Sequence, residues 1–70
     1  MVSVNGDVKY DYDDKEVLCE LFADTRAEVT SDMEVVGLAK GFAFAHGSSV
    51  MTADGQVAFM KSNGEWNWVE

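Results

Sequence analysis

Two turn dipeptides, Asp54-Gly55 and Asn63-Gly64, most constrain how this chain can fold, because they divide its C-terminal end into three short β-forming segments. Both dipeptides are typical of two-residue type I′ hairpin turns, whose two central residues need positive φ. They predict strands at 48–53, 56–62 and 65–69. The C-terminal end of the chain is therefore expected to fold as an antiparallel meander.

Two-residue turns would also determine how these three strands pair. Counting outward from the turns gives the opposed pairs Thr52–Val57, Val50–Phe59, Phe59–Trp68 and Lys61–Trp66. Directly opposed residues share one face of a sheet. The face expected to form the core carries Val50, Thr52, Val57, Phe59, Trp66 and Trp68. The opposite face carries Met51, Ala53, Ala58, Met60, Asn67 and Val69, and we expect it to meet a second surface.

Three upstream segments also show β patterns. Residues 41–47 alternate large and small side chains, with Phe42 and Phe44 on one side, which predicts a strand or extended arm bounded by glycines. Residues 33–38 predict another brief strand. Near the N-terminus, Asn5-Gly6 lies between the β-forming segments 1–4 and 8–12, which indicates a further hairpin with Tyr10 and Tyr12 on one face.

Residues 15–29 fit two patterns. The helical pattern has a stripe of Val17, Leu18, Leu21 and Phe22 with Asp14 as N-cap. The strand pattern alternates Val17, Cys19, Leu21 and Ala23 with outward acids. Acids recur along the whole segment and only Arg26 lies near its end, which disfavours a helix. We favour a strand through 17–23, followed by a turn or a single helical turn at 24–28, and keep the helix as the alternative.

The predicted fold is mostly β: a small antiparallel meander of about five or six short strands, with room for one short helix within 14–29. Seventy residues make one domain, 1–70, because domains rarely fall below about 50 residues. Chains of this size often depend on disulfides, a metal or association. Cys19 has no cysteine to pair with, and Cys19 and His46 are too few for a zinc site. We therefore expect a homo-oligomer and no metal or cofactor.

Charge narrows the range of partners. The formal net charge is −8, which disfavours direct binding to nucleic acid or to an anionic membrane. Residues 1–34 contain ten acids and three bases (−7), whereas residues 35–70 contain three acids and two bases (−1). We expect the acidic half to face outward or toward a partner. No segment approaches the roughly 18 apolar residues of a membrane span, and the N-terminus does not resemble a signal peptide.

Catalytic and metal-binding motifs are weak. His46 precedes Gly47-Ser48-Ser49, but neighbours on a β segment rarely place a base against a hydroxyl. Cys19 has no adjacent base to lower its pKa. The acidic run of Asp11, Asp13, Asp14 and Glu16 lacks the glycine and glutamate of a calcium loop. We predict no catalytic, cofactor-binding or metal-binding residues.

Several segments together resemble a family: Phe22-Ala23-Asp24-Thr25-Arg26-Ala27-Glu28-Val29, Gly47-Ser48-Ser49-Val50, Thr52-Ala53-Asp54, and Ser62-Asn63-Gly64-Glu65-Trp66-Asn67-Trp68-Val69. In this order they are similar to small virion-structural proteins of tailed bacteriophages, of the head-decoration or head-fibre type. The resemblance covers about residues 20–70. It implies a β-rich, non-enzymatic protein attached to a capsid or tail, and it assigns no functional residue.

The resulting hypothesis is a minor structural component of a phage particle, made in the host cytoplasm and located in the virion. It would dock on a capsid or other virion protein through an apolar sheet face. The candidate interface residues are Met51, Ala58, Met60, Val69, Trp66 and Trp68. The alternative is an acidic inhibitor or DNA mimic that binds a basic host protein, which needs its acids in two regular rows.

Overall fold

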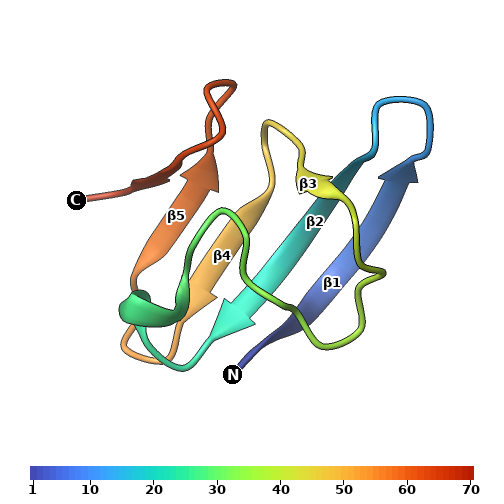
Figure 1. Ribbon diagram of the computed structural model, residues 1–70. Helices are drawn as coiled ribbons and strands as arrows, with labels where there is room; N and C mark the ends of the chain where they lie inside the picture. Colours follow the sequence, from blue (N-terminus) through green and yellow to red (C-terminus); the bar gives the residue numbers. More distant parts are fainter.

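A long antiparallel hairpin begins the sheet in the computed structural model, which describes residues 1–70. It consists of β1 (Val2–Asp11) and β2 (Glu16–Ala23) (Figure 1). A single 3-10 turn, η1 (Arg26–Glu28), follows. The later strands are β3 (Ala43–Phe44), β4 (Ser49–Thr52), β5 (Val57–Met60) and β6 (Trp66–Trp68). The prediction of a mostly β fold with about five or six short strands is confirmed.

The sheet is mixed, so the prediction of a purely antiparallel meander is wrong at its centre. The strand order is β1-β2-β4-β5-β6, and β2 pairs in parallel with both β3 and β4. Only the β1–β2 hairpin and the β4–β5–β6 meander are antiparallel. A parallel pair needs a long crossover connection, and residues 24–48 provide it.

The strand interpretation of residues 15–29 is confirmed, and the helix alternative is wrong. Along β2, Val17, Cys19, Leu21 and Ala23 are buried, and the residues between them face the other side. The predicted single helical turn is η1, where the Glu28 carboxylate accepts a hydrogen bond from the Thr25 backbone N–H (3.0 Å). Alternating apolar residues therefore determined the local structure, as expected for a strand that buries one face.

The predicted hairpin at Asn5-Gly6 is wrong, because β1 continues through these residues. The pairing with β2 shifts between Val4 and Val8, so residues 5–7 form a β-bulge, and Gly6 has a φ of 151°. The chain turns later, at 12–15. There the Asp11 carboxylate accepts hydrogen bonds from the backbone N–H groups of Asp13 and Asp14, both at 3.1 Å. Aspartate side chains commonly stabilise turns by accepting hydrogen bonds from the backbone N–H groups of the residues that follow.

Both hairpin loops of the β4–β6 meander contain three residues, where two were predicted. In the first, the Gly55 N–H donates to the Thr52 carbonyl (3.0 Å), and the Thr52 N–H donates to the Gln56 carbonyl (2.8 Å). The 62–64 loop has the same two bonds around Gly64, at 3.0 and 2.9 Å. Only the glycine of each loop has positive φ, 88° and 83°. This geometry is a type I turn followed by a left-handed glycine.

The extra loop residue shifts each pairing by one position and thereby exchanges the two faces of β5. Val50 lies opposite Ala58, and Ala58 lies opposite Trp68. Ala58 and Met60 are buried, at 0% and 2% exposure, whereas Phe59 is 46% exposed on the opposite face. The predicted core face is confirmed for Val50, Thr52, Trp66 and Trp68, and it is wrong for Val57 and Phe59.

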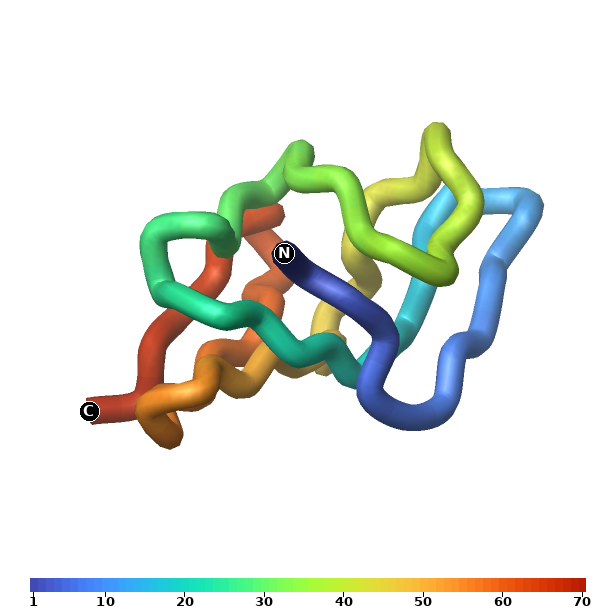
Figure 2. The backbone as a smooth tube through the Cα atoms, turned by 90° about the horizontal axis from the view of Figure 1, so that it is seen from below, coloured from blue at the N-terminus to red at the C-terminus, as the bar shows by residue number.

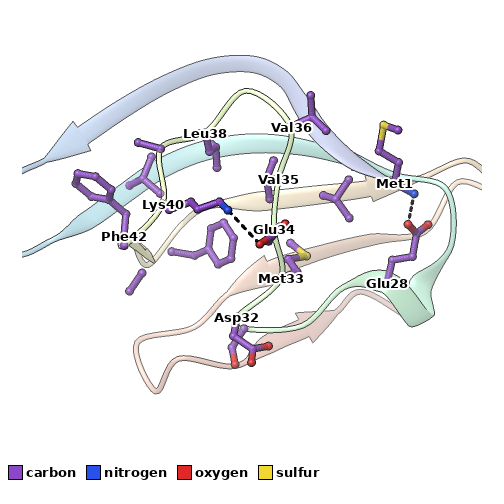
Figure 3. Close-up of a pocket in the computed structure, with 17 residues that line it drawn as sticks. Met1, Glu28, Asp32, Met33, Glu34, Val35, Val36, Leu38, Lys40 and Phe42 are labelled. Atoms are coloured by element: carbon purple, nitrogen blue, oxygen red, sulfur yellow. Dashed lines mark hydrogen bonds and ion pairs between the residues drawn. The ribbon is translucent and has the colours of Figure 1, made fainter.

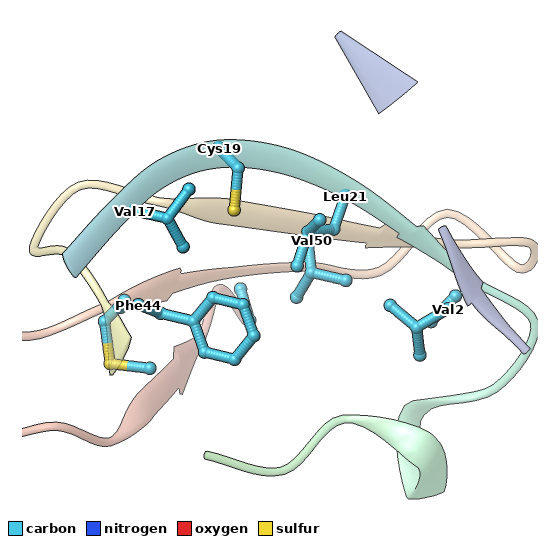
Figure 4. Close-up of a cluster of buried hydrophobic side chains, with 9 residues drawn as sticks. Val2, Val17, Cys19, Leu21, Phe44 and Val50 are labelled. Atoms are coloured by element: carbon cyan, nitrogen blue, oxygen red, sulfur yellow. The ribbon is translucent and has the colours of Figure 1, made fainter. Parts of the chain in front are cut away.

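The crossover connection lies over one face of the sheet, which we call the inner face (Figures 1 and 2). The predicted strand at 33–38 is wrong, because only Val36 forms a bridge there. Its N–H donates to the Val2 carbonyl (2.9 Å), and its carbonyl accepts from the Val4 N–H (3.2 Å). The core lies between the sheet and this connection (Figure 4). It consists of Val2, Val17, Cys19, Leu21, Ala23, Phe44, Val50, Ala58 and Met60.

Candidate functional site

The face of the sheet that points away from the core carries several exposed or half-buried apolar side chains. We call this group the outer apolar patch, and it consists of Leu18, Phe22, Met51, Val57, Phe59 and Val69. Phe22 lies opposite Met51, and Met51 lies opposite Val57. The Val69 N–H donates to the Val57 carbonyl (2.8 Å), which extends this row beyond β6. Leu18, Met51, Phe59 and Val69 are 43–58% exposed. The row crosses the sheet from β2 to the end of the chain.

Acidic residues border this patch on β1 and β2. Glu16 and Glu20 occupy the same face as Leu18, because residues two apart on a strand point the same way. Asp11 lies directly opposite Glu16, and Lys9 lies opposite Leu18. Like charges placed directly opposite one another destabilise a sheet. The outer face therefore combines an apolar area, which runs from Phe22 of β2 across β4–β6, with an acidic area on β1 and the rest of β2.

The six candidate interface residues from the sequence separate into three groups. Met51 and Val69 lie on the outer apolar patch, where they are accessible, and their role at an interface stays a prediction. Ala58 and Met60 are buried in the core, so their predicted place on an accessible face is wrong. Trp66 and Trp68 are partly buried against the core. The one-residue shift in the hairpin pairings explains the misplaced pair.

The tryptophans hold the crossover connection against the meander. The centres of the Trp66 and Phe44 rings are 5.3 Å apart, and the Trp66 indole N–H donates to the Thr30 carbonyl (3.1 Å). The Arg26 guanidinium lies 4.7 Å from the centre of the Trp68 ring, in cation–π geometry. Both residues therefore act in packing within the chain.

Sequence reasoning missed Leu18, Phe22 and the two outward residues of β5. For Leu18 and Phe22 a signal was present, since the alternation that buries their odd-numbered neighbours places them outward. Val57 and Phe59 were assigned to the core face because the hairpin loops were predicted to contain two residues, whereas they contain three.

A cavity of about 860 Å³ lies beneath the crossover connection, on the inner side of the sheet (Figure 3). Val2, Val17 and Phe44 form part of its apolar wall, and residues 31–43 contribute most of the rest. Met1, Glu28 and Lys40 also line it, so charged groups lie at its margin. No sequence pattern pointed to this cavity, because its walls come from distant segments.

The candidate catalytic residues do not form a site. His46 is exposed, and Ser48 is fully buried. The Ser48 hydroxyl donates to the Val17 carbonyl (3.1 Å) and accepts from the Cys19 N–H (3.3 Å), so it is engaged in structural hydrogen bonds. Burial raises the pKa of the Cys19 thiol, which is opposite to what a reactive cysteine needs.

The acidic run does not converge on a metal site. One oxygen of Asp11 closes the turn at 12–15, and no group of three or more His, Cys, Asp or Glu side chains is arranged to hold a metal ion. The interpretation of the acidic run as a solvated turn agrees with this geometry.

The structure has no helix whose length and apolarity would allow it to cross a membrane.

Comparison with known proteins gives no match: no protein-family model, no curated protein and no solved structure is significantly similar to the chain.

Proposed function

We propose that this protein is a non-enzymatic accessory component of a phage particle that docks onto a larger virion protein. The observation that carries the proposal is the outer apolar patch. Single exposed apolar residues are ordinary on a protein surface, but a contiguous group bordered by charge is typical of an interaction surface. The resemblance of residues 20–70 to small virion-structural proteins supplies the class of partner.

The chemistry of the outer face defines the complementary surface on the partner. The apolar area of β4–β6 fits an apolar patch, and the acidic area of β1–β2 fits basic side chains beside it. The opposed pair Asp11 and Glu16 is unfavourable in the isolated chain. A basic group on the partner would relieve this repulsion when the two proteins meet.

The alternative, an acidic inhibitor or DNA mimic that binds a basic host protein, is less well supported. Mimicry needs two regular rows of negative charge. On β2 the outward acids Glu16 and Glu20 are separated by Leu18, and on β1 Lys9 interrupts the acidic area. The apolar half of the same face has no counterpart in a phosphate backbone. This arrangement favours docking through an apolar surface over mimicry of DNA.

Particles purified from a host that produces the chain test the proposal. Mass spectrometry should detect the wild-type protein in washed particles at a fixed copy number. Met51→Lys and Phe59→Lys place a charge in the outer apolar patch and should be lost from the particles. Val36→Lys is the matched control, because Val36 is also exposed (58%) but lies on the crossover connection.

The wild-type chain tests the virion assignment, and the variants test docking through the outer apolar patch. Absence of the wild-type chain from the particles would overturn the virion assignment. Retention of Met51→Lys and Phe59→Lys at wild-type copy number would overturn docking through the patch. Circular dichroism of the three variants should show the same fold, because all three positions are exposed.

A further inference from the structure

The cavity beneath the crossover connection is not used by the proposed docking surface, since it lies on the opposite side of the sheet. We propose that it binds a small amphipathic cation, a molecule with an apolar body and one ammonium group. The proposal goes beyond the proposed function. It rests on the residues that line the cavity, on the segment between η1 and β3 that covers it, and on the charges at its margin.

The walls can take an apolar body of small-molecule size. The volume of about 860 Å³ falls within the range of small-molecule sites, roughly 300–1,000 Å³. Eleven of the 17 lining residues are hydrophobic. The apolar side chains of Val35, Leu38 and Phe42 come from the connection (Figure 3), and the sheet contributes Val2 and Val17 to the lining. Such a lining favours aliphatic or aromatic groups over polar ones.

The segment that covers the cavity is held to the sheet by few backbone hydrogen bonds. Between η1 and β3 the chain has no helix or strand, and Val36 forms its only bridge to the sheet. Two further hydrogen bonds tie it to the sheet: the Ala39 backbone N–H donates to the Tyr10 hydroxyl (3.0 Å), and the Trp66 indole N–H donates to the Thr30 carbonyl (3.1 Å). A segment with so few hydrogen bonds opens at a lower free energy than the sheet beneath it.

The charges at the margin select a cation. Of the acids that line the cavity, Glu34 is paired with Lys40 (3.4 Å), and Glu28 is paired with the amino group of Met1. Asp32 forms no ion pair, and its carboxylate accepts a hydrogen bond only from the Thr30 hydroxyl (3.0 Å). An ammonium group at the margin would therefore find one carboxylate without a cationic partner. The net charge of −8 also attracts cations and repels anionic amphiphiles.

A matched series of probes tests this inference on the full chain. 4-Phenylbutylamine, 4-phenylbutanol and 4-phenylbutanoate share one apolar body and differ in charge. Titrations followed by ¹H–¹⁵N NMR should show saturable shifts at the backbone amides of Val2, Val35 and Leu38 with the amine. The alcohol should bind more weakly, and the carboxylate more weakly still.

Two variants identify the charged group. Asp32→Asn should weaken binding of the amine about two- to fivefold, the range expected for loss of an exposed ion pair, and should leave binding of the alcohol unchanged. Asp13→Asn removes the same charge from the 12–15 turn, whose residues do not line the cavity, and should leave both affinities unchanged.

Three results would overturn the inference. The first is no saturable shift at the cavity with the amine. The second is carboxylate binding as strong as amine binding. The third is an equal loss in the Asp32→Asn and Asp13→Asn variants, which would show that net charge alone attracts the amine. None of these results bears on docking through the outer apolar patch, so the two proposals fail independently.

Discussion

Ser48 closes a gap at the centre of the sheet, and its replacement by alanine is the sharpest test of how this fold is held together. β2 pairs with β3 at Glu16 and Val17 and with β4 from Glu20 onward. Cys19 lies between these two ladders. Its backbone N–H donates to the Ser48 hydroxyl (3.3 Å), which substitutes for a strand partner. Ser48→Ala removes that acceptor from a fully buried position.

The expected cost follows from the groups that are left without partners. The Val17 carbonyl keeps the hydrogen bond from the Ala45 N–H (2.8 Å), so it loses only one of two donors. The Cys19 N–H loses its acceptor, and an unsatisfied buried polar group costs about 1–3 kcal/mol. A chain of this length has a free energy of unfolding of roughly 4–10 kcal/mol, at about 0.05–0.15 kcal/mol per residue. Ser48→Ala should therefore remove a large part of the stability.

Urea and thermal unfolding followed by circular dichroism measure this loss. A cost of about 2 kcal/mol should lower Tm by roughly 8–16 °C in a domain of this size. Ser49→Ala is the control, because the next residue points to the outer face and its hydroxyl makes no hydrogen bond. Hydrogen exchange at the Cys19 amide should accelerate in Ser48→Ala alone. Equal stability of the two variants would refute the reasoning.

Three further predictions follow from single groups. Hydrogen bonds from the Thr52 hydroxyl and the Gln56 amide lower the pKa of Asp54 below its ordinary value of 3.8, so this group stabilises the fold above that pH and its contribution is lost as the pH falls through the lower folded pKa. Urea midpoints from pH 5 to 2 should accordingly fall less steeply for Asp54→Asn, and identical slopes would contradict this. Glu16→Gln should raise the free energy of unfolding by a few tenths of a kcal/mol, since it removes repulsion from the opposed Asp11; a lower urea midpoint would argue against that repulsion. The Cys19 thiol should react with a thiol reagent only when the chain unfolds, because burial raises its pKa and blocks access, and rapid labelling of the folded protein would disprove this.

Sequence reasoning succeeded where one strand carried its own signal. The alternation of Val17, Cys19, Leu21 and Ala23 identified β2, because a strand with one buried face has a period of two residues. The choice of strand over helix also placed the single helical turn at η1. Signals of this kind lie within a few consecutive residues.

Hairpin pairing could not be predicted to the residue, because Asp-Gly and Asn-Gly fit both two-residue and three-residue loops. The glycine has a positive φ in a two-residue loop and in a three-residue loop, so the dipeptide does not indicate which loop forms. Only the packing decides where the next strand begins. Ala58, which is fully buried, lies opposite Trp68, whereas Phe59 lies opposite Asn67 on the other face. Which of these two residues enters the core depends on packing between distant segments.

The cavity and the central parallel pairing depend on contacts between distant segments. Nothing local to β2 or β4 indicates that they lie side by side, because the meander pattern would fit a separate sheet equally well. The walls of the cavity likewise join residues 31–44 to Val2 and Val17. Patterns of a few residues carry no information on which segments meet across the core.

The parallel ladder between β2 and β4 has a consequence for the rate of folding. Leu21 pairs with Val50, 29 positions away, whereas the β1–β2 hairpin and the β4–β6 meander close over short turns. Closing a chain segment of that length costs about 3 kcal/mol of entropy before the ladder forms. The two hairpin units can therefore form early and independently, and their association through β2 and β4 should limit the rate at which the native sheet appears.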